Sequence, residues 1–185
     1  MTPVLFLDVD GVLNCSSTKL HAPGVRSCVL QRPCSLTRFT GVVETAKVAA
    51  LARAVQACGA KIVVSSTWRE AFETGAAFAA AIGLVPPLVS APDLVHRDWR
   101  TGWKPSSNRH HEIGWWLDDH RKVKRFAILD DHDICAHAPQ LEKRFVRTDA
   151  ETGLVNADLA AIVTLLGRAD LAARDWFEET PAAAA

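Results

Sequence analysis

The chain has 185 residues, of which 49% are hydrophobic and 23% are charged, and its formal net charge at pH 7 is zero. This length suits one domain that buries its own core. The neutral charge argues against a strong, sequence-independent attraction to nucleic acid or to anionic membranes, without excluding a local basic groove. No run of about 18 apolar residues is present and the N-terminus lacks a basic region, so we expect a cytoplasmic protein without a membrane span. The five cysteines are irregularly spaced, which favours reduced thiols over disulfides or a zinc site.

The first half of the chain opens with residues 4–7, a wholly apolar run typical of a strand that is covered on both faces. Residues 12–40 show no clean period and indicate an insertion that arches over this strand. Residues 43–58 have apolar side chains at helical spacing and end before Gly59, where a helix C-cap belongs. Residues 61–65 predict a second buried strand.

The middle of the chain predicts two further helices. Residues 68–82 form the first, which stops at Gly83. Residues 88–89 predict a short strand, and residues 90–107 indicate a long loop because they lack a period. Ser107 or Asn108 then caps a second helix that runs to about His120.

The last third contains a clear strand at residues 125–129 and a shorter one at residues 145–146. Residues 156–166 and 168–177 have the pattern of helices. The tail, residues 178–185, ends in alanines and is expected to be disordered.

Strands and helices therefore alternate, which predicts an α/β fold: a Rossmann-like three-layer α/β/α sandwich with a central parallel sheet. We expect a single domain over residues 1–185, with a small flap or cap insertion at 14–41. In such sheets, ligands bind at the carboxyl ends of the strands.

Polar clusters follow three of the predicted strands. Asp8 and Asp10 follow the first, residues 65–67 (Ser-Ser-Thr) the second, and Asp130 with Asp131 the third. Carboxylates gathered at one edge repel each other unless a cation compensates, and Mg²⁺ prefers such hard oxygen ligands. The pattern predicts a Mg²⁺ site formed by Asp8, Asp10, Asp130 and Asp131, with Asp10 contributing its backbone carbonyl.

In the segment Asp8-Val9-Asp10-Gly11, two aspartates are separated by one residue and followed by a glycine. If the backbone stays extended, Asp8 and Asp10 leave the same side of the chain, and Gly11 permits a tight turn close to a ligand. The alternative is an ordinary loop. The buried strand before it and the double aspartate at 130–131 favour a site.

At this point the chain resembles the haloacid-dehalogenase-like (HAD) superfamily over roughly residues 3–166. The resemblance rests on residues 6–14, 63–69, Lys104 and 128–131. It is closest to compact HAD domains associated with RNA-repair proteins, on the segments 10–14, 65–69, 109–117 and 148–154.

The resemblance implies an aspartyl-phosphate phosphatase. Asp8 would be the nucleophile, and Asp10 would protonate the leaving group and then activate water. Ser66 would bind phosphate together with Gly11, although its neighbours at 65 and 67 leave the register open. Lys104 would neutralise the phosphate, and Arg109 competes for that role because it can grip phosphate bidentately.

Several nearby side chains have two interpretations. Arg69 reaches phosphate or forms a surface pair with Glu70 or Glu73. Asp133 is expected to cap a helix, and His132 to be a solvated loop imidazole. The tryptophans at 99, 103, 115 and 116 pack in the core or stack on bases, with 99 and 103 the better stacking candidates.

The insertion at 14–41 has a local positive charge, because it holds five basic-type side chains and no Asp or Glu. Such a flap suits an anionic substrate. We therefore expect a phosphomonoesterase that acts on a nucleotide or a nucleic-acid terminus. The alternatives are a phosphatase of small sugar or nucleoside phosphates and a non-catalytic phosphate-binding module.

Overall fold

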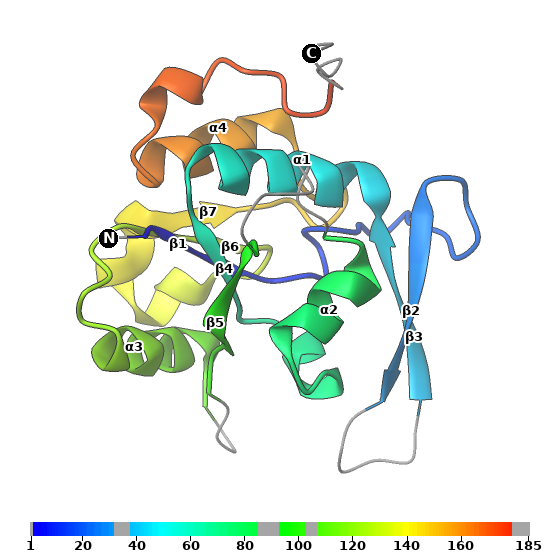
Figure 1. Ribbon diagram of the computed structural model, residues 1–185, viewed down its shortest axis with the longest axis horizontal. Coiled ribbons are helices and arrows are strands. Elements are labelled where there is room, and N and C mark those ends of the chain that lie inside the picture. Colours follow the sequence, from blue (N-terminus) through cyan, green and yellow to red (C-terminus); the bar gives the residue numbers. More distant parts are fainter. Residues whose placement is uncertain (1, 32–37, 85–92, 103–106, 179–185) are drawn as a thin grey trace.

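The computed structural model describes residues 2–31, 38–84, 93–102 and 107–178, and its centre is a five-stranded sheet (Figure 1). The strand order is β5-β4-β1-β6-β7, and every pairing is parallel. The strands are β1 (Val4–Leu7), β4 (Lys61–Val64), β5 (Val95–Arg100), β6 (Phe126–Asp130) and β7 (Phe145–Arg147). The predicted parallel α/β sandwich is confirmed.

The register brings the carboxyl ends of the three central strands to the same level. Leu7 of β1 lies beside Val64 of β4 and Leu129 of β6. The ladder continues past the strands, because the Asp8 amide donates to the Leu129 carbonyl at 2.9 Å and the Ser65 amide donates to the Leu7 carbonyl at 2.9 Å. The residues that follow these strands are therefore immediate neighbours.

Helices cover both faces of the sheet. On one face lie α1 (Thr45–Ala57) and α4 (Asn156–Leu165), and on the other lie α3 (Arg109–Asp119) and the 3₁₀ turns η2 (Ile134–His137) and η3 (Pro139–Arg144) (Figure 1). Strand residues alternate between the two cores.

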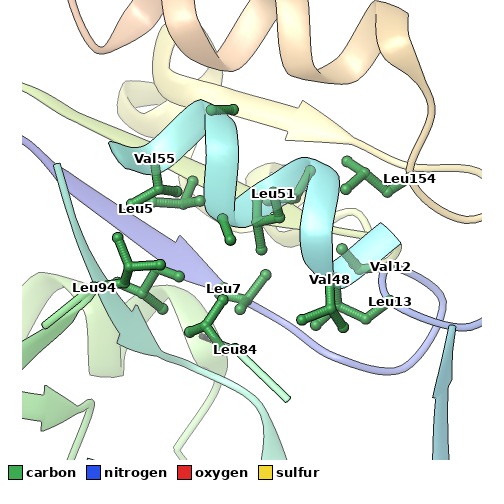
Figure 2. Close-up of a cluster of buried hydrophobic side chains, with 14 of the residues drawn as sticks. Leu5, Leu7, Val12, Leu13, Val48, Leu51, Val55, Leu84, Leu94 and Leu154 are labelled. Atoms are coloured by element: carbon green, nitrogen blue, oxygen red, sulfur yellow. The ribbon is translucent and has the colours of Figure 1, made fainter. Parts of the chain in front are cut away.

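The larger core forms under α1, which places its apolar stripe on the sheet. Figure 2 shows Leu51 and Val55 of this helix close to Leu5 and Leu7 of β1, all fully buried. The smaller core contains Val4 and Phe6, whose side chains leave the opposite face of the same strand. Because both faces of β1 are buried, all four of its residues are apolar.

Residues 68–82 form two elements instead of the one predicted helix. A 3₁₀ turn η1 (Thr67–Ala71) is followed by the short helix α2 (Gly75–Ile82). Thr74 lies between them in an extended conformation, and its hydroxyl accepts from the Ala77 amide at 3.1 Å. This cap starts a new helix, which ends as predicted at Gly83 in the left-handed conformation.

Two predicted loops contain strands. The insertion holds an antiparallel hairpin, β2 (Val25–Gln31) and β3 (Arg38–Glu44), and the predicted loop at 90–107 holds β5 at the sheet edge. In both regions only part of the strand is buried, such as Cys28 and Leu30 in β2. A few buried positions among polar ones do not produce a clear period.

The segment after α4 is also different from the prediction. Residues 168–177 contain only the 3₁₀ turn η4 (Ala169–Leu171). The chain then reaches back so that Trp176 becomes fully buried, and Arg53 of α1 donates two hydrogen bonds to its carbonyl. Continuing the helix would carry Trp176 away from this site.

Some of the remaining predictions are confirmed, and others concern residues outside the described ranges. Gly59 follows α1 with a positive φ of 58°, as expected of a helix end, and α3 begins after Asn108. The predicted strand at 88–89 and all of the tail except Glu178 lie outside the described residues. Across the described ranges, no helix has the length and apolar character needed to cross a membrane.

Candidate active site

Two buried carboxylates face each other at the carboxyl ends of β1 and β6. Asp8 is 4% exposed and Asp130 is fully buried. Each places its Oδ2 atom 2.5 Å from Nη1 of Arg109, the first residue of α3. Through its contacts with both carboxylates, Nη1 of Arg109 links the ends of β1 and β6 to α3.

Asp131 and His132 complete a cluster of possible metal ligands with these two carboxylates. One ligand atom from each of the four residues lies within 4.8 Å of the others. The His132 side chain is 79% exposed, yet its Nδ1 lies 2.7 Å from Oδ1 of Asp131. The predicted solvated imidazole is thus exposed but also paired.

The charges in this cluster perturb each other. Burial, reinforced by the Asp8 carboxylate, raises the pKa of Asp130 to about 6. Burial also opposes the charge of Arg109, but the Asp8 and Asp130 carboxylates outweigh it and raise the Arg109 pKa. Three carboxylates and one guanidinium leave a net negative site. Its hard oxygen donors fit Mg²⁺.

Position 11 requires glycine because the Asp131 side chain lies where a Cβ would be. The φ of Gly11 is +69°, and a Cβ at this position would lie 2.4 Å from Oδ2 of Asp131. Its carbonyl accepts from the Thr148 hydroxyl at 2.9 Å, and its amide donates to Oδ1 of Asn14 at 2.8 Å. The loop after β1 is therefore fixed from two sides.

We expect the substitution Gly11→Ala to lower the free energy of unfolding by more than Gly59→Ala does. Both glycines have positive φ, so each alanine carries a left-handed penalty of roughly 1–2 kcal/mol. A Cβ at Gly59 meets nothing within 4 Å, whereas one at Gly11 collides with Asp131. Urea denaturation measures both variants. Equal losses would show that the loop relaxes freely around the collision.

Asp10 is held at both carboxylate oxygens. Oδ1 accepts from Nδ2 of Asn14 at 3.0 Å, and Oδ2 accepts from the indole Nε1 of Trp68 at 2.9 Å. Among the described residues, the four-member ligand cluster does not include the Asp10 side chain. Its predicted metal contact, through the backbone carbonyl, stays a prediction.

The two donors to Asp10 connect it to the hairpin. Asn14 also donates to the Val42 carbonyl of β3 at 2.8 Å. The Trp68 ring packs against Gly41, where a Cβ would lie 2.4 Å from it. Neither Asn14 nor Trp68 is among the predicted site residues, although both belong to the segments that carry the resemblance.

The serines after β4 are both fully buried. Ser66 caps the 3₁₀ turn η1, since its Oγ accepts from the Trp68 amide at 3.4 Å. Within the described part of the chain, the Ser65 hydroxyl has no hydrogen-bond partner. Phosphate binding by Ser66 stays a prediction, and Ser65 is an equally placed alternative.

Arg69 forms a buried ion pair that the sequence does not predict. Its Nη2 lies 2.9 Å from Oε2 of Glu112 on α3, and both side chains are 4% exposed. Its Nη1 donates to the carbonyls of Ser65 and Ser66 at 2.6 and 2.9 Å. The predicted surface pair of Arg69 is therefore wrong, because this side chain holds the serine loop against α3.

Comparison with known families identifies the chain. The family model described as "HAD domain in Swiss Army Knife RNA repair proteins" matches residues 4–159. The chain belongs to this family of HAD domains. A search of curated proteins and a search of solved structures each returned no match. Family membership supports a phosphatase-type function and agrees with the acidic cluster at the strand ends.

The other candidates in this HAD domain have mixed outcomes. Asp133 caps η2, as predicted, by accepting from two backbone amides at 3.1 Å. Trp99 is a core residue on β5, buried and stacked on Phe78, so core packing is confirmed for it and the base-stacking alternative is wrong. Lys104 and Trp103 lie outside the described residues.

The basic side chains of the insertion project from the hairpin region of the HAD domain. Lys19, His21, Arg26 and Arg38 are exposed, and Arg32 lies outside the described residues. The hairpin itself extends from the body beside α2 (Figure 1). Its charge is consistent with the positive flap that the sequence indicates.

Proposed function

We propose that this HAD domain is a Mg²⁺-dependent phosphomonoesterase that acts through an aspartyl-phosphate on a nucleotide or a nucleic-acid terminus. The observation that carries the proposal is the convergence of Asp8, Asp130 and Asp131. Their ligand atoms lie within 4.8 Å of one another at the carboxyl ends of adjacent strands. Family membership supports the same chemistry.

Asp8 is the proposed nucleophile. Its Oδ1 accepts from the Val9 amide at 2.8 Å and its Oδ2 contacts Arg109, so the carboxylate has a fixed direction. One of its oxygens attacks phosphorus, a P–O bond forms, and the bond to the leaving oxygen breaks. A water molecule then attacks phosphorus and releases inorganic phosphate, which restores the carboxylate.

Asp10 is the proposed acid and base. It gives a proton to the leaving oxygen and later accepts one from the attacking water, so the two steps balance. Its hydrogen bonds to Asn14 and Trp68 position the carboxyl without making it part of the ligand cluster. A carboxyl group outside the metal-ligand cluster is suited to proton transfer, because it does not coordinate the metal.

Asp8, Asp130 and Asp131 would hold Mg²⁺, together with the backbone carbonyl of Asp10. Bound there, Mg²⁺ supplies positive charge to the phosphate and to the developing negative charge of the reaction. We assign phosphate neutralisation to Arg109, since it already contacts Asp8, with Lys104 and Ser66 as further phosphate ligands. Gly11 is the weakest of these ligands, because its amide already donates to Asn14.

The proposed nucleic-acid substrate rests on two observations. The matched family is described by its occurrence in RNA repair proteins, and exposed basic side chains lie on the hairpin and in the segment before it. A polyanion gains from such charges, whereas a small sugar phosphate has no second phosphate to meet them.

Phosphate release from matched substrates tests this proposal. We expect kcat/KM for 3′- or 5′-phosphorylated oligonucleotides to exceed that for sugar phosphates by about tenfold or more, which corresponds to about 1.4 kcal/mol. EDTA should abolish the release and added Mg²⁺ should restore it. Preference for sugar phosphates would favour the metabolite phosphatase, and tight Mg²⁺-dependent binding without turnover would favour a binding module.

A further inference from the structure

A second group of possible metal ligands lies outside the active site. It consists of His96 and Asp98 on the edge strand β5 and His120 directly after α3. One ligand atom of each lies within 4.8 Å of the others. No residue of this group belongs to the cluster around Asp8, and the proposed phosphatase mechanism does not use any of them.

The hydrogen-bond partners of His120 indicate a cation. Its Nδ1 lies 2.7 Å from the Trp116 carbonyl and its Nε2 lies 3.0 Å from Oδ2 of Asp98. Both partners only accept hydrogen bonds, whereas a neutral imidazole has one N–H and one lone pair. A neutral ring can donate to only one of these two acceptors, so a cation between Nε2 and Oδ2 of Asp98 would satisfy both atoms.

The arrangement around His120 is the one found for metal-bound histidines. Such rings usually donate their second N–H to a carboxylate or to a backbone carbonyl, as Nδ1 does here to Trp116. The ring is also held by stacking on Trp116, with centroids 3.7 Å apart and planes 9° from parallel. Nε2 is thus fixed in the direction of Asp98.

The separation of the donors fits a small divalent ion. Two ligands in a tetrahedral zinc shell are about 3.4 Å apart, given zinc–ligand distances near 2.1 Å. Nε2 of His120 and Oδ2 of Asp98 are 3.0 Å apart. His96 is adjacent, with its ring centroid 5.5 Å from that of His120.

Two existing interactions compete with a metal at these residues. Nδ1 of His96 accepts from the Asp98 amide at 3.0 Å, and Oδ2 of Asp98 lies 3.3 Å from Nε of Arg97. The Arg97 pair is weak because the Arg97 side chain is 88% exposed. If the metal takes Nδ1 of His96, it replaces the hydrogen bond from the Asp98 amide, which is worth about 1 kcal/mol.

We propose that His96, Asp98 and His120 bind a divalent transition-metal ion of the zinc class. Imidazole nitrogen with one carboxylate suits Zn²⁺, whereas Mg²⁺ prefers an all-oxygen shell such as the one at Asp8. A cavity of about 480 Å³, lined in part by Asp98 and His120, opens beside the group and gives an ion access. Water completes the coordination.

Such an ion would fasten α3 to the edge of the sheet. At this end of the helix, the indole of Trp116 also donates to the Asp98 carbonyl of β5 at 3.0 Å. The same helix carries Arg109 at its first turn, where it meets Asp8 and Asp130. The ion would therefore stabilise the helix that supports the active site.

Isothermal titration of the full chain with Zn²⁺, in excess Mg²⁺, tests the proposal. We expect one Zn²⁺ per chain, with affinity reduced about tenfold or more in His120→Phe and in Asp98→Asn. His120→Phe keeps a ring on Trp116, and Asp98→Asn changes an exposed group, so at least one variant should fold. His132→Ala is the matched control at the active-site cluster and should bind Zn²⁺ as the parent does.

Thermal unfolding gives a second readout. Zn²⁺ should raise the Tm of the parent and of His132→Ala, but not the Tm of His120→Phe or Asp98→Asn. Absence of Zn²⁺ binding by the parent would overturn the proposal. Loss of binding in His132→Ala alone would also overturn it, since the ion would then belong to the active site.

Discussion

Replacing Asp8 by asparagine should abolish Mg²⁺-dependent phosphate release, with kcat reduced by roughly three orders of magnitude or more. The amide is a poor nucleophile and brings no negative charge to the metal, so both steps that depend on Asp8 are lost. Its shape is almost unchanged, and the hydrogen bond from the Val9 amide can persist. The loss should therefore reflect chemistry and not folding.

Initial rates with a generic aryl phosphate measure this effect, because such a substrate does not depend on nucleic-acid contacts. Asp133→Asn is a suitable control, since Asp133 caps η2 and asparagine caps almost as well. This variant should keep the parent rate. Acid quenching during turnover should trap phosphate on the parent chain and not on Asp8→Asn. Full activity in Asp8→Asn would exclude the proposed nucleophile.

The second large effect concerns stability. Replacing Arg69 by methionine should lower the free energy of unfolding by about 3–5 kcal/mol, because it leaves the Glu112 carboxylate buried without its cation. Burial lowers the pKa of Arg69 by more than the Glu112 carboxylate raises it. Among the described residues, Glu112 would keep hydroxyl contacts, from Ser107 at 2.8 Å and from Thr101 at 3.5 Å.

Urea denaturation of a double-mutant cycle separates the ion pair from the packing. Glu112→Leu alone should also be costly, since it strands the Arg69 guanidinium. The double variant Arg69→Met with Glu112→Leu should lose less than the two single losses added together, because no buried charge remains. Additive losses would indicate that Arg69 and Glu112 contribute to stability through packing and not through their charge interaction.

The strand ends of this domain could be predicted because each buried strand is a short apolar run followed at once by polar residues. This pattern predicts Asp8, Asp130 and Asp131 as strand-end residues, and the parallel arrangement of the strands then predicts that they lie together. Glu112 has no such signature. It lies in a helix with ordinary amphipathic spacing, and only the partner at Arg69, 43 residues away, gives it a role.

The hairpin and β5 were not predictable for a different reason. Each is an edge element with one face in solvent, so exposed residues such as Val29 and Arg100 interrupt its pattern. Trp68 and Asn14 depend on that same hairpin for their positions next to Asp10. The supports of the site therefore come from the regions where local sequence is least informative.

The segment around Trp176 extends the folded body beyond the residues that the family model matches. The Trp176 amide donates to Oδ1 of Asn156 on α4 at 2.9 Å, while Arg168 donates to the last carbonyl of α1 at 2.7 Å. A polypeptide cut at residue 159 would lose most of α4 and would expose the apolar surface of α1 that α4 covers. Anyone trimming this protein for crystallisation should keep the chain through residue 178.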